Sequence, residues 1–208
     1  NSANTTTAMY VNGGLLNWTS TGSTWEGPGS GDGLGLGNSG IEQSTETANG
    51  CISNFRVVKG KRVYACDQGV AGFQPPSGPL ENITGTYLLC AKDPTDPLAY
   101  EVAPAVPTLT ITANGNTSAN SAAPTGLSGS ARFDGNGDNL SLSSNNRFFF
   151  GYGDFTIECW IKTTNSTIDS GRERRVYQTH GGANAVGNLQ ISVKSTTYSL
   201  DNTCLNLS

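Results

Sequence analysis

Residues 155–162 read FTIECWIK, a run in which β-branched and aromatic residues predict a β-strand. A strand with an apolar face is stable only when other strands or a second sheet cover it. The sequence ends at residue 208, so few of those covering strands can follow it. We therefore expect many of its partner strands among the residues that precede it, in the same chain or in a neighbouring copy.

The rest of the chain also reads as short strands joined by turns. TAMYVNGG (7–14) ends in the hairpin dipeptide Asn12-Gly13, and CISNFRVVKG (51–60) is predicted to be a strand. We expect an extended loop at 72–80, where prolines restrict the backbone. GLGLG (33–37) is expected to form a short strand with no side chains on one face. Further strand signals lie at 86–91 and 108–116, and in SARFDG, NLSLS, RFFFG (147–151), RVYQTH, NLQISVK and TYSLDN. The pattern predicts an all-β fold of the sandwich or barrel type.

Composition narrows the classes of function. The 208 residues include 27 Gly and only 13% are charged, which is typical of short strands and turns. A formal net charge of -4 gives no basic stripe for a phosphate backbone, so no nucleic acid is expected as partner. No apolar run approaches the roughly 20 residues that span a bilayer, so no membrane span is expected. Five cysteines and an excess of N-glycosylation sequons favour an extracellular setting.

Residues 126–162, GLSGSARFDGNGDNLSLSSNNRFFFGYGDFTIECWIK, resemble the opening of a laminin G-like or concanavalin A-like domain. That family often shows an aromatic-Asp-Gly turn, an alternating strand, and then DFTIE with a Trp. Residues 172–208 continue in the family's order. GCISNFRVVKG (50–60) and GFQPPSGPLENITGTYLLCAK (72–92) resemble its late strand, Pro-rich loop and closing strand, as in viral tail fibres and microbial surface proteins. The resemblance implies an antiparallel jelly-roll β-sandwich of the concanavalin A-like type.

The two parts of this resemblance stand in swapped order. Residues 1–116 resemble the C-terminal half of the sandwich, residues 130–208 resemble its N-terminal half, and residues 117–129 read as a linker. Each half alone would expose an apolar sheet face. Either the chain is a circular permutant that closes on itself, or a neighbouring copy completes each sandwich and a head-to-tail filament results. The sequence leaves both arrangements open.

Glycoside hydrolases share the implied fold, and they need two carboxylates roughly 5–9.5 Å apart across the sugar. Their laminarinase-type members carry a Glu-x-Asp-x-Glu strand, which this sequence lacks. Glu42 and Glu46 lie in a Ser/Thr-rich loop, and Glu158 stands alone, so we interpret all three as solvated surface carboxylates. His180 precedes two glycines and reads as a turn residue. We therefore expect no catalytic residue and no enzyme.

DGNGDN (134–139) places Asp134, Asn136 and Asp138 at alternate positions, as at the start of a calcium loop. The glutamate that should close such a loop is missing, because position 145 is Asn. We favour a Gly-rich hairpin turn, with no metal and no other cofactor. Calcium stays the alternative.

A sugar site needs an exposed aromatic ring with polar groups beside it. Trp160 is expected in the core, and at least one of Phe148–Phe150 must point away from its neighbours, where it could dock against another protomer. GRERR (171–175) reads as a solvated turn with internal Glu–Arg pairing, or else as a salt bridge to an acidic neighbour. The candidates for stacking on a sugar are Trp18, Trp25 and Tyr152.

Spacing alone does not fix the pairing of the cysteines. We favour a disulfide between Cys66 and Cys90, which would clamp the Pro-rich loop. Cys51 and Cys159 lie on strands that are neighbours in the family resembled, and are a second candidate pair; Cys204 would then be left to bridge to another subunit. The sequons expected to carry glycans are Asn4, Asn17, Asn82, Asn116 and Asn165, whereas Asn139 and Asn206 lie in or near strands and are less suitable.

Together these features favour an extracellular structural or adhesive protein, secreted or part of a surface or virion fibre. Its sandwich units would assemble head-to-tail into a fibre or repeat array, with further copies of the chain as partners. The alternative is a self-contained, carbohydrate-binding, lectin-like module whose partner is a glycan. Filaments seen by electron microscopy would distinguish the first from the second.

Overall fold

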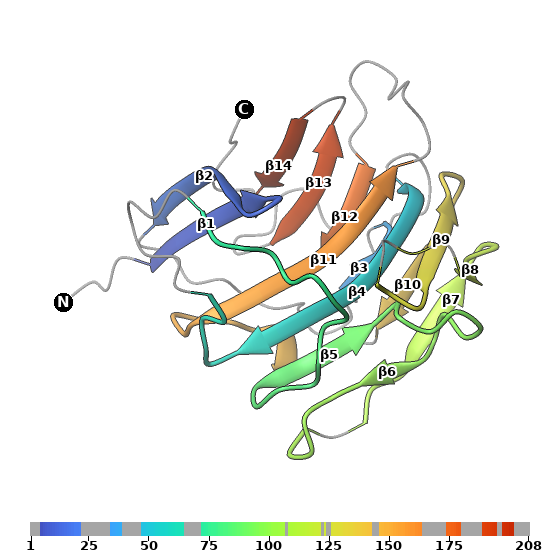
Figure 1. The fold of residues 1–208 in the computed structure, drawn as a ribbon, viewed down its shortest axis with the longest axis horizontal. Coiled ribbons are helices and arrows are strands. Elements are labelled where there is room, and N and C mark those ends of the chain that lie inside the picture. Colours follow the sequence, from blue (N-terminus) through green and yellow to red (C-terminus); the bar gives the residue numbers. More distant parts are fainter. Residues whose placement is uncertain are drawn as a thin grey trace.

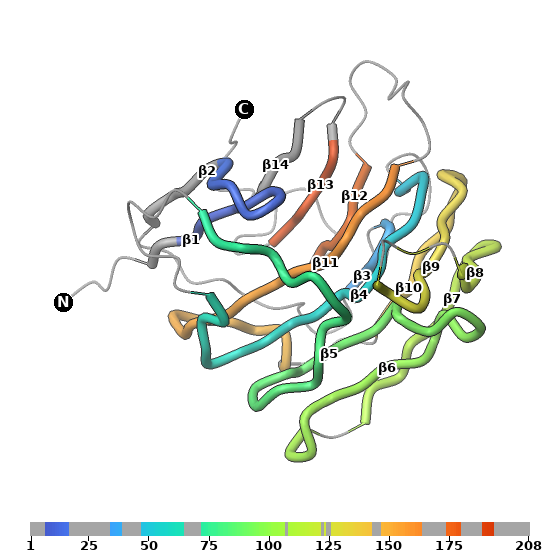
Figure 2. Tube along the Cα trace, in the orientation of Figure 1, coloured from blue at the N-terminus to red at the C-terminus, as the bar shows by residue number. Residues whose placement is uncertain are grey.

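The computed structural model describes residues 5–21, 34–38, 47–64, 72–106, 108–121, 123, 126–142, 146–163, 174–179, 189–194 and 197–201 (Figure 2). These residues form fourteen strands and one short 3-10 helix, so the described part of the chain is all-β. The elements are β1 (Thr5–Val11), β2 (Gly14–Thr21), β3 (Leu34–Leu36), β4 (Asn49–Lys59), β5 (Thr86–Cys90), β6 (Tyr100–Glu101), β7 (Ile111–Asn114), β8 (Ser118–Asn120), β9 (Ser130–Asp134), β10 (Asn139–Leu142), η1 (Asn146–Phe148), β11 (Phe155–Thr163), β12 (Arg174–Gln178), β13 (Gln190–Lys194) and β14 (Thr197–Asp201).

Two antiparallel, curled sheets lie face to face, as in a β-sandwich (Figure 1). The β4 sheet has the order β6-β5-β4-β9-β8, and β11 pairs along the remaining edge of β4. The β3 sheet has the order β14-β13-β12-β3-β10-β7. A separate hairpin, β1–β2, lies beside these sheets. The predicted all-β class and antiparallel pairing are confirmed.

The core fills the space between the two sheets. Phe55 of β4 stacks on Tyr177 of β12, with ring centroids 5.3 Å apart, and both side chains are fully buried. Period-2 alternation on β11 places Phe155, Ile157, Cys159 and Ile161 against the core. Further buried members are Leu34, Leu36, Ile52, Val57, Leu88, Leu109, Ile111, Ala131, Phe133, Leu140, Leu142, Phe148, Phe150, Val176, Leu189 and Val193.

Strands from before and after residues 117–129 alternate in both sheets. β4 pairs with β9 and β11, and β3 pairs with β10 and β12, all within one chain. Residues of both parts also belong to one apolar cluster. The described strands on both sides of residues 117–129 therefore enclose one apolar cluster within a single chain. The segment predicted as a linker is partly a strand, because β8 pairs with β9 at its start.

The Pro-rich segment 72–80 crosses the outer face of β4 and β11, and holds the hairpin β1–β2 on that side (Figure 1). Asn12 and Gly13 have φ of 51° and 81°, the left-handed geometry that a two-residue turn requires. The carbonyl of Gly13 in this turn accepts a hydrogen bond from Phe73 N at 2.8 Å. Both the hairpin and the extended loop were predicted from these residues.

Two local predictions were wrong. RFFFG is not a strand, because η1 ends at Phe148 and redirects the chain from β10 in one sheet to β11 in the other. Trp160 is half-buried and lies outside the core cluster, because alternation on β11 places it on the same face as Glu158, away from the core. Within the described residues, no helix has the length and apolarity needed to cross a bilayer.

Candidate functional site

Two segments that are far apart in the sequence meet at the end of β4. Gly60, with φ of 79°, ends the strand and donates its N–H to Asp154 O at 2.7 Å. Val63 N donates to Thr156 Oγ1 at 3.0 Å. These bonds bring the KGKR turn (59–62) beside the loop that leads into β11. We name this surface the basic–aromatic corner, defined by Lys61, Arg62, Phe149, Tyr152 and Asp154.

The aromatic half of the corner is set by which phenylalanines reach the core. Phe148 is fully buried, and Phe150 stacks on Phe155 with centroids 4.4 Å apart. Phe149 therefore points outward and is 44% exposed, which confirms that one of the three turns away from its neighbours. Tyr152, a predicted stacking candidate, is 62% exposed. The corner thus presents two aromatic rings to solvent.

The charged half of the corner is mostly basic. Lys61, Arg62 and Asp154 are all exposed, and Arg62 Nε lies 3.9 Å from Asp154 Oδ1. Lys59, in the same KGKR turn, is half-buried: its Nζ donates to Arg147 O at 3.3 Å and lies 5.4 Å from the centre of the Tyr87 ring. Burial lowers the pKa of Lys59. This KGKR cluster was not predicted, although three basic residues among four are a readable signal in the sequence.

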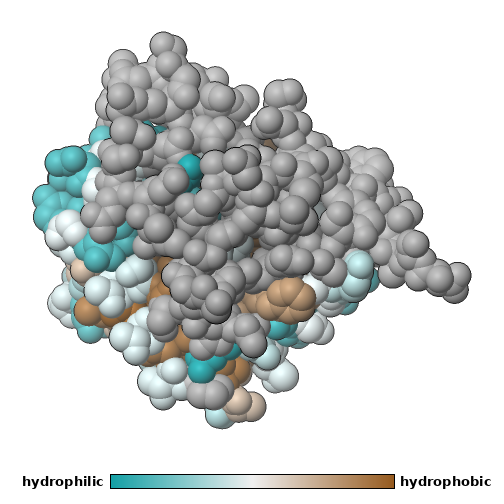
Figure 3. Space-filling model, turned by 180° about the vertical axis from the view of Figure 1, so that it is seen from behind, coloured by the Kyte–Doolittle hydropathy of each residue, from teal (hydrophilic) through white to brown (hydrophobic). Residues whose placement is uncertain are grey.

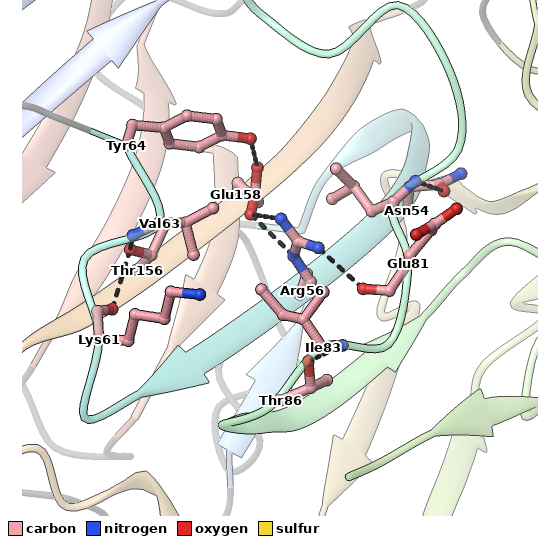
Figure 4. A network of polar contacts seen from close by, with 11 residues as sticks. Asn54, Arg56, Lys61, Val63, Tyr64, Glu81, Ile83, Thr86, Thr156 and Glu158 are labelled. Atoms are coloured by element: carbon pink, nitrogen blue, oxygen red, sulfur yellow. Dashed lines mark hydrogen bonds and ion pairs between the residues drawn. The ribbon is translucent and has the colours of Figure 1, made fainter.

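A polar clasp fixes the base of the corner (Figure 4). Arg56 of β4 stands opposite Glu158 of β11 and donates from Nε and Nη2 to Glu158 Oε1, at 2.8 and 2.6 Å. Tyr64 OH donates to Glu158 Oε2, and Arg56 Nη1 donates to Glu81 O at 2.8 Å. Burial, together with the hydrogen bond to Glu158, raises the pKa of Tyr64.

The clasp corrects the interpretation of Glu158 as a solvated carboxylate. The side chains of Arg56 and Glu158 are 6% and 15% exposed. Both carboxylate oxygens accept strong hydrogen bonds, one of them from a guanidinium. A carboxylate held in this way serves as an anchor between strands, and is poorly placed to give or take a substrate proton.

The DGNGDN motif is a hydrogen-bonded turn. Asp138, which is 1% exposed, accepts from Asn116 N and Asp134 N, each at 2.8 Å. Asp134 accepts from Asn136 N at 2.7 Å and from Asn116 Nδ2 at 3.0 Å. These bonds lower the pKa of Asp134, the bond from Asn136 N most of all. All four carboxylate oxygens bind N–H groups, and the described residues contain no cluster of three or more His, Cys, Asp or Glu that could hold a metal.

The expected disulfide between Cys66 and Cys90 is not formed, because Cys90 is a free thiol that is fully buried in the core. Cys51 and Cys159 are also free, although their strands are neighbours as expected. The register explains this, since Cys51 lies opposite Lys162 and not Cys159. Burial raises the pKa of Cys159 to about 12, which keeps its thiol protonated. Cys66 and Cys204 lie outside the described residues.

The other predicted positions are distributed as follows. Arg174 and Arg175 belong to β12, and Arg175 is only 8% exposed, so this part of GRERR is not a solvated turn. Of the sequons, Asn82 and Asn116 are exposed, Asn17 lies in β2, and Asn139 is 1% exposed, which fits its lower suitability for a glycan. Trp18 also lies in β2. The positions outside the described residues are Asn4, Trp25, Glu42, Glu46, Asn165, residues 171–173, His180 and Asn206.

No protein-family model, curated protein or solved structure matches this chain. The resemblance to laminin G-like and concanavalin A-like domains therefore stays a prediction.

Proposed function

We propose that this chain is an extracellular, concanavalin A-like jelly-roll sandwich that is self-contained and acts by adhesion to carbohydrate. The observation that carries the proposal is the closure of the core within one chain. Strands from residues 1–116 and 130–208 pair in the same two sheets and enclose one apolar cluster. Closure supports the lectin-like alternative, because a neighbouring copy is not needed to cover either half.

The state of Glu158 supports binding without turnover. Glycoside hydrolysis needs one carboxyl group that can give a proton and a second that can act as base or nucleophile. Glu158 is bound by Arg56 and Tyr64 from two sides, and the carboxylates of the DGNGDN turn are bound by N–H groups. We therefore propose a role of contact and display.

An extracellular location is compatible with the free thiols. Cys51 and Cys90 are buried, and Cys159 packs against the core. Burial raises the pKa values of Cys90 and Cys159, so the reactive thiolate is scarce at both positions. These thiols persist in an oxidising medium because oxidants do not reach them readily.

The test combines size measurement with glycan binding. We expect sedimentation and electron microscopy of the purified chain to show discrete monomers, and a glycan array to show binding. The control is incubation with a panel of β-glucans, from which no reducing sugar should be released. Filaments whose subunits exchange strands, or an array without any bound glycan, would contradict the proposal.

A further inference from the structure

The basic–aromatic corner combines features that the adhesive role alone does not require. It has two outward aromatic rings, two exposed cations and one exposed carboxylate on neighbouring loops. We propose that it is a binding site for acidic carbohydrate, meaning a sugar that carries a carboxylate or sulfate group. The inference rests on the proposed carbohydrate-binding function, and adds to it the place of the site and the class of sugar.

Tyr152 supplies the stacking surface. An exposed aromatic ring is costly in water unless a partner covers it, and the C–H groups on one face of a sugar ring are a suitable partner. Tyr152 lies between Gly151 and Gly153, and Gly153 N donates to Phe150 O at 3.1 Å. The loop is therefore a closed turn with small neighbours on both sides of the ring.

The charges select an acidic ligand. The whole chain carries a formal charge of -4, yet three of the four residues 59–62 are basic. Lys61 and Arg62 are exposed, and a single carboxylate, Asp154, stands beside them in the described loop. The Arg62–Asp154 pair, at 3.9 Å with both side chains more than half exposed, is weak. Because Lys61 and Arg62 are exposed to solvent, a sulfate or carboxylate can reach both cations, and a guanidinium suits such an anion in geometry.

A second copy of the chain fits the corner less well. Two corners placed face to face would bring cations against cations, which is unfavourable. A specific protein interface also uses about 20 residues on each side, and five side chains fall far short of that. A sugar of a few rings matches the size of the corner.

The corner is also pre-organised. Gly60 N and Val63 N tie the turn to the loop, and the Arg56–Glu158–Tyr64 clasp fixes both to β4 and β11. Rigid presentation reduces the entropy lost on binding, which a shallow surface site needs in order to reach useful affinity.

The experiment measures affinity for a sulfated heparin octasaccharide, an oligogalacturonate and a neutral cello-oligosaccharide by calorimetry. We expect the acidic sugars to bind and the neutral one to bind at least about tenfold more weakly. Tyr152→Ala should weaken acidic-sugar binding about tenfold, equal to about 1.4 kcal/mol, whereas Tyr152→Phe, which keeps the ring, should not. Lys61→Ala with Arg62→Ala should also weaken it and flatten its dependence on salt.

Asp154→Asn should change the affinity for acidic sugars in the opposite direction. Removal of the only carboxylate at the described corner should strengthen binding of both acidic sugars severalfold and leave the neutral sugar unaffected. Arg132→Ala is the matched control and should leave binding unchanged. Arg132 is an exposed cation of β9, and it lies opposite Cys51 in the strand register, near the other end of β4. Circular dichroism of every variant verifies that it is folded.

The outcomes separate the two proposals. If acidic sugars bind the native chain but Tyr152→Ala and the Lys61/Arg62 double variant bind equally well, the assignment of the corner is wrong and the adhesive function stands. If neutral sugars bind as tightly as acidic ones, the acidic class is wrong. If no sugar binds, both proposals fall. Self-association that is lost in Phe149→Ala would identify a second copy as the occupant and overturn the carbohydrate assignment.

Discussion

Two Gly-rich loops of this molecule look alike in sequence and differ in what they offer to a ligand. The turn DGNGD (134–138) has its two carboxylates fully occupied by N–H donors, and Asp138 is 1% exposed. The loop FFGYGD (149–154) directs Tyr152 and Asp154 into solvent, with the Asp154 side chain 60% exposed. The first loop resembles a calcium motif and is structural, whereas the second carries no familiar motif and holds the available groups.

Residue types alone therefore do not identify a site. What counts is whether the bonding capacity of each group is already used within the fold. A change in the turn or in the clasp should therefore reduce stability, and a change in the open loop should reduce binding. Four substitutions test this division.

Arg56→Met should have the largest effect on stability. It removes the cation of a nearly buried ion pair and leaves the Glu158 carboxylate without its positive partner. Breaking such a pair by removing one partner costs about 3–5 kcal/mol of unfolding free energy. Urea denaturation followed by tryptophan fluorescence measures the loss. The double variant Arg56→Met/Glu158→Leu is the control and should recover most of it, so equal instability of both variants would contradict the clasp.

Asp138→Ala should destabilise the turn. Two backbone N–H groups, those of Asn116 and Asp134, lose their acceptor. We expect a loss of about 2 kcal/mol in unfolding free energy, from the usual contribution of hydrogen bonds to a charged group. The same variant should bind glycan as the native chain does, and a binding defect without a stability defect would reverse the roles of the two loops.

Acidification should weaken the turn through Asp134. Hydrogen bonds lower the pKa of Asp134 from its ordinary value of 3.8, so its contribution to stability is present above that pH and is lost as the pH falls through the lower, folded value. Solvent exposure limits the effect to under about 1 kcal/mol. Urea denaturation of the native chain and of Asp134→Asn at several pH values isolates the contribution of this carboxylate. The native chain should have the larger unfolding free energy near pH 6, and its advantage over the variant should shrink below pH 3.8. A constant difference across this range would contradict the assignment.

Tyr152→Ala should have the smallest effect on stability, within about 0.5 kcal/mol, because its side chain is largely in water. Thermal unfolding monitored by circular dichroism provides the measurement. A large fall in melting temperature would show that the ring is packed within the fold, and would end its role as a free platform.

Much of the fold follows from local sequence. The Asn12-Gly13 turn, the strands at 51–60 and 86–91, and the bare face of GLGLG each depend on a few adjacent residues, and each prediction agrees with the structure. Trp160 could have been placed correctly as well. Strict alternation from Phe155 assigns it to the face of Glu158, away from the core.

The candidate site could be predicted only in pieces. Tyr152 and an outward phenylalanine were expected, but their meeting with KGKR (59–62) depends on β4 pairing with β11. Such long-range pairing is decided by the packing of the whole core, which periodicity does not report. For the same reason, the sequence left closure within one chain and closure between copies open.

The position of β4 has a consequence for how the molecule forms. Arg56 and Glu158 face each other across neighbouring strands although 102 positions separate them in sequence. A contact between residues so far apart in sequence forms only after a long loop has closed, and that closure costs conformational entropy. β-Proteins whose contacts are mainly of this kind fold in roughly milliseconds to seconds. During synthesis, β4 leaves the ribosome well before β11 exists, and it has to stay unaggregated until that partner arrives.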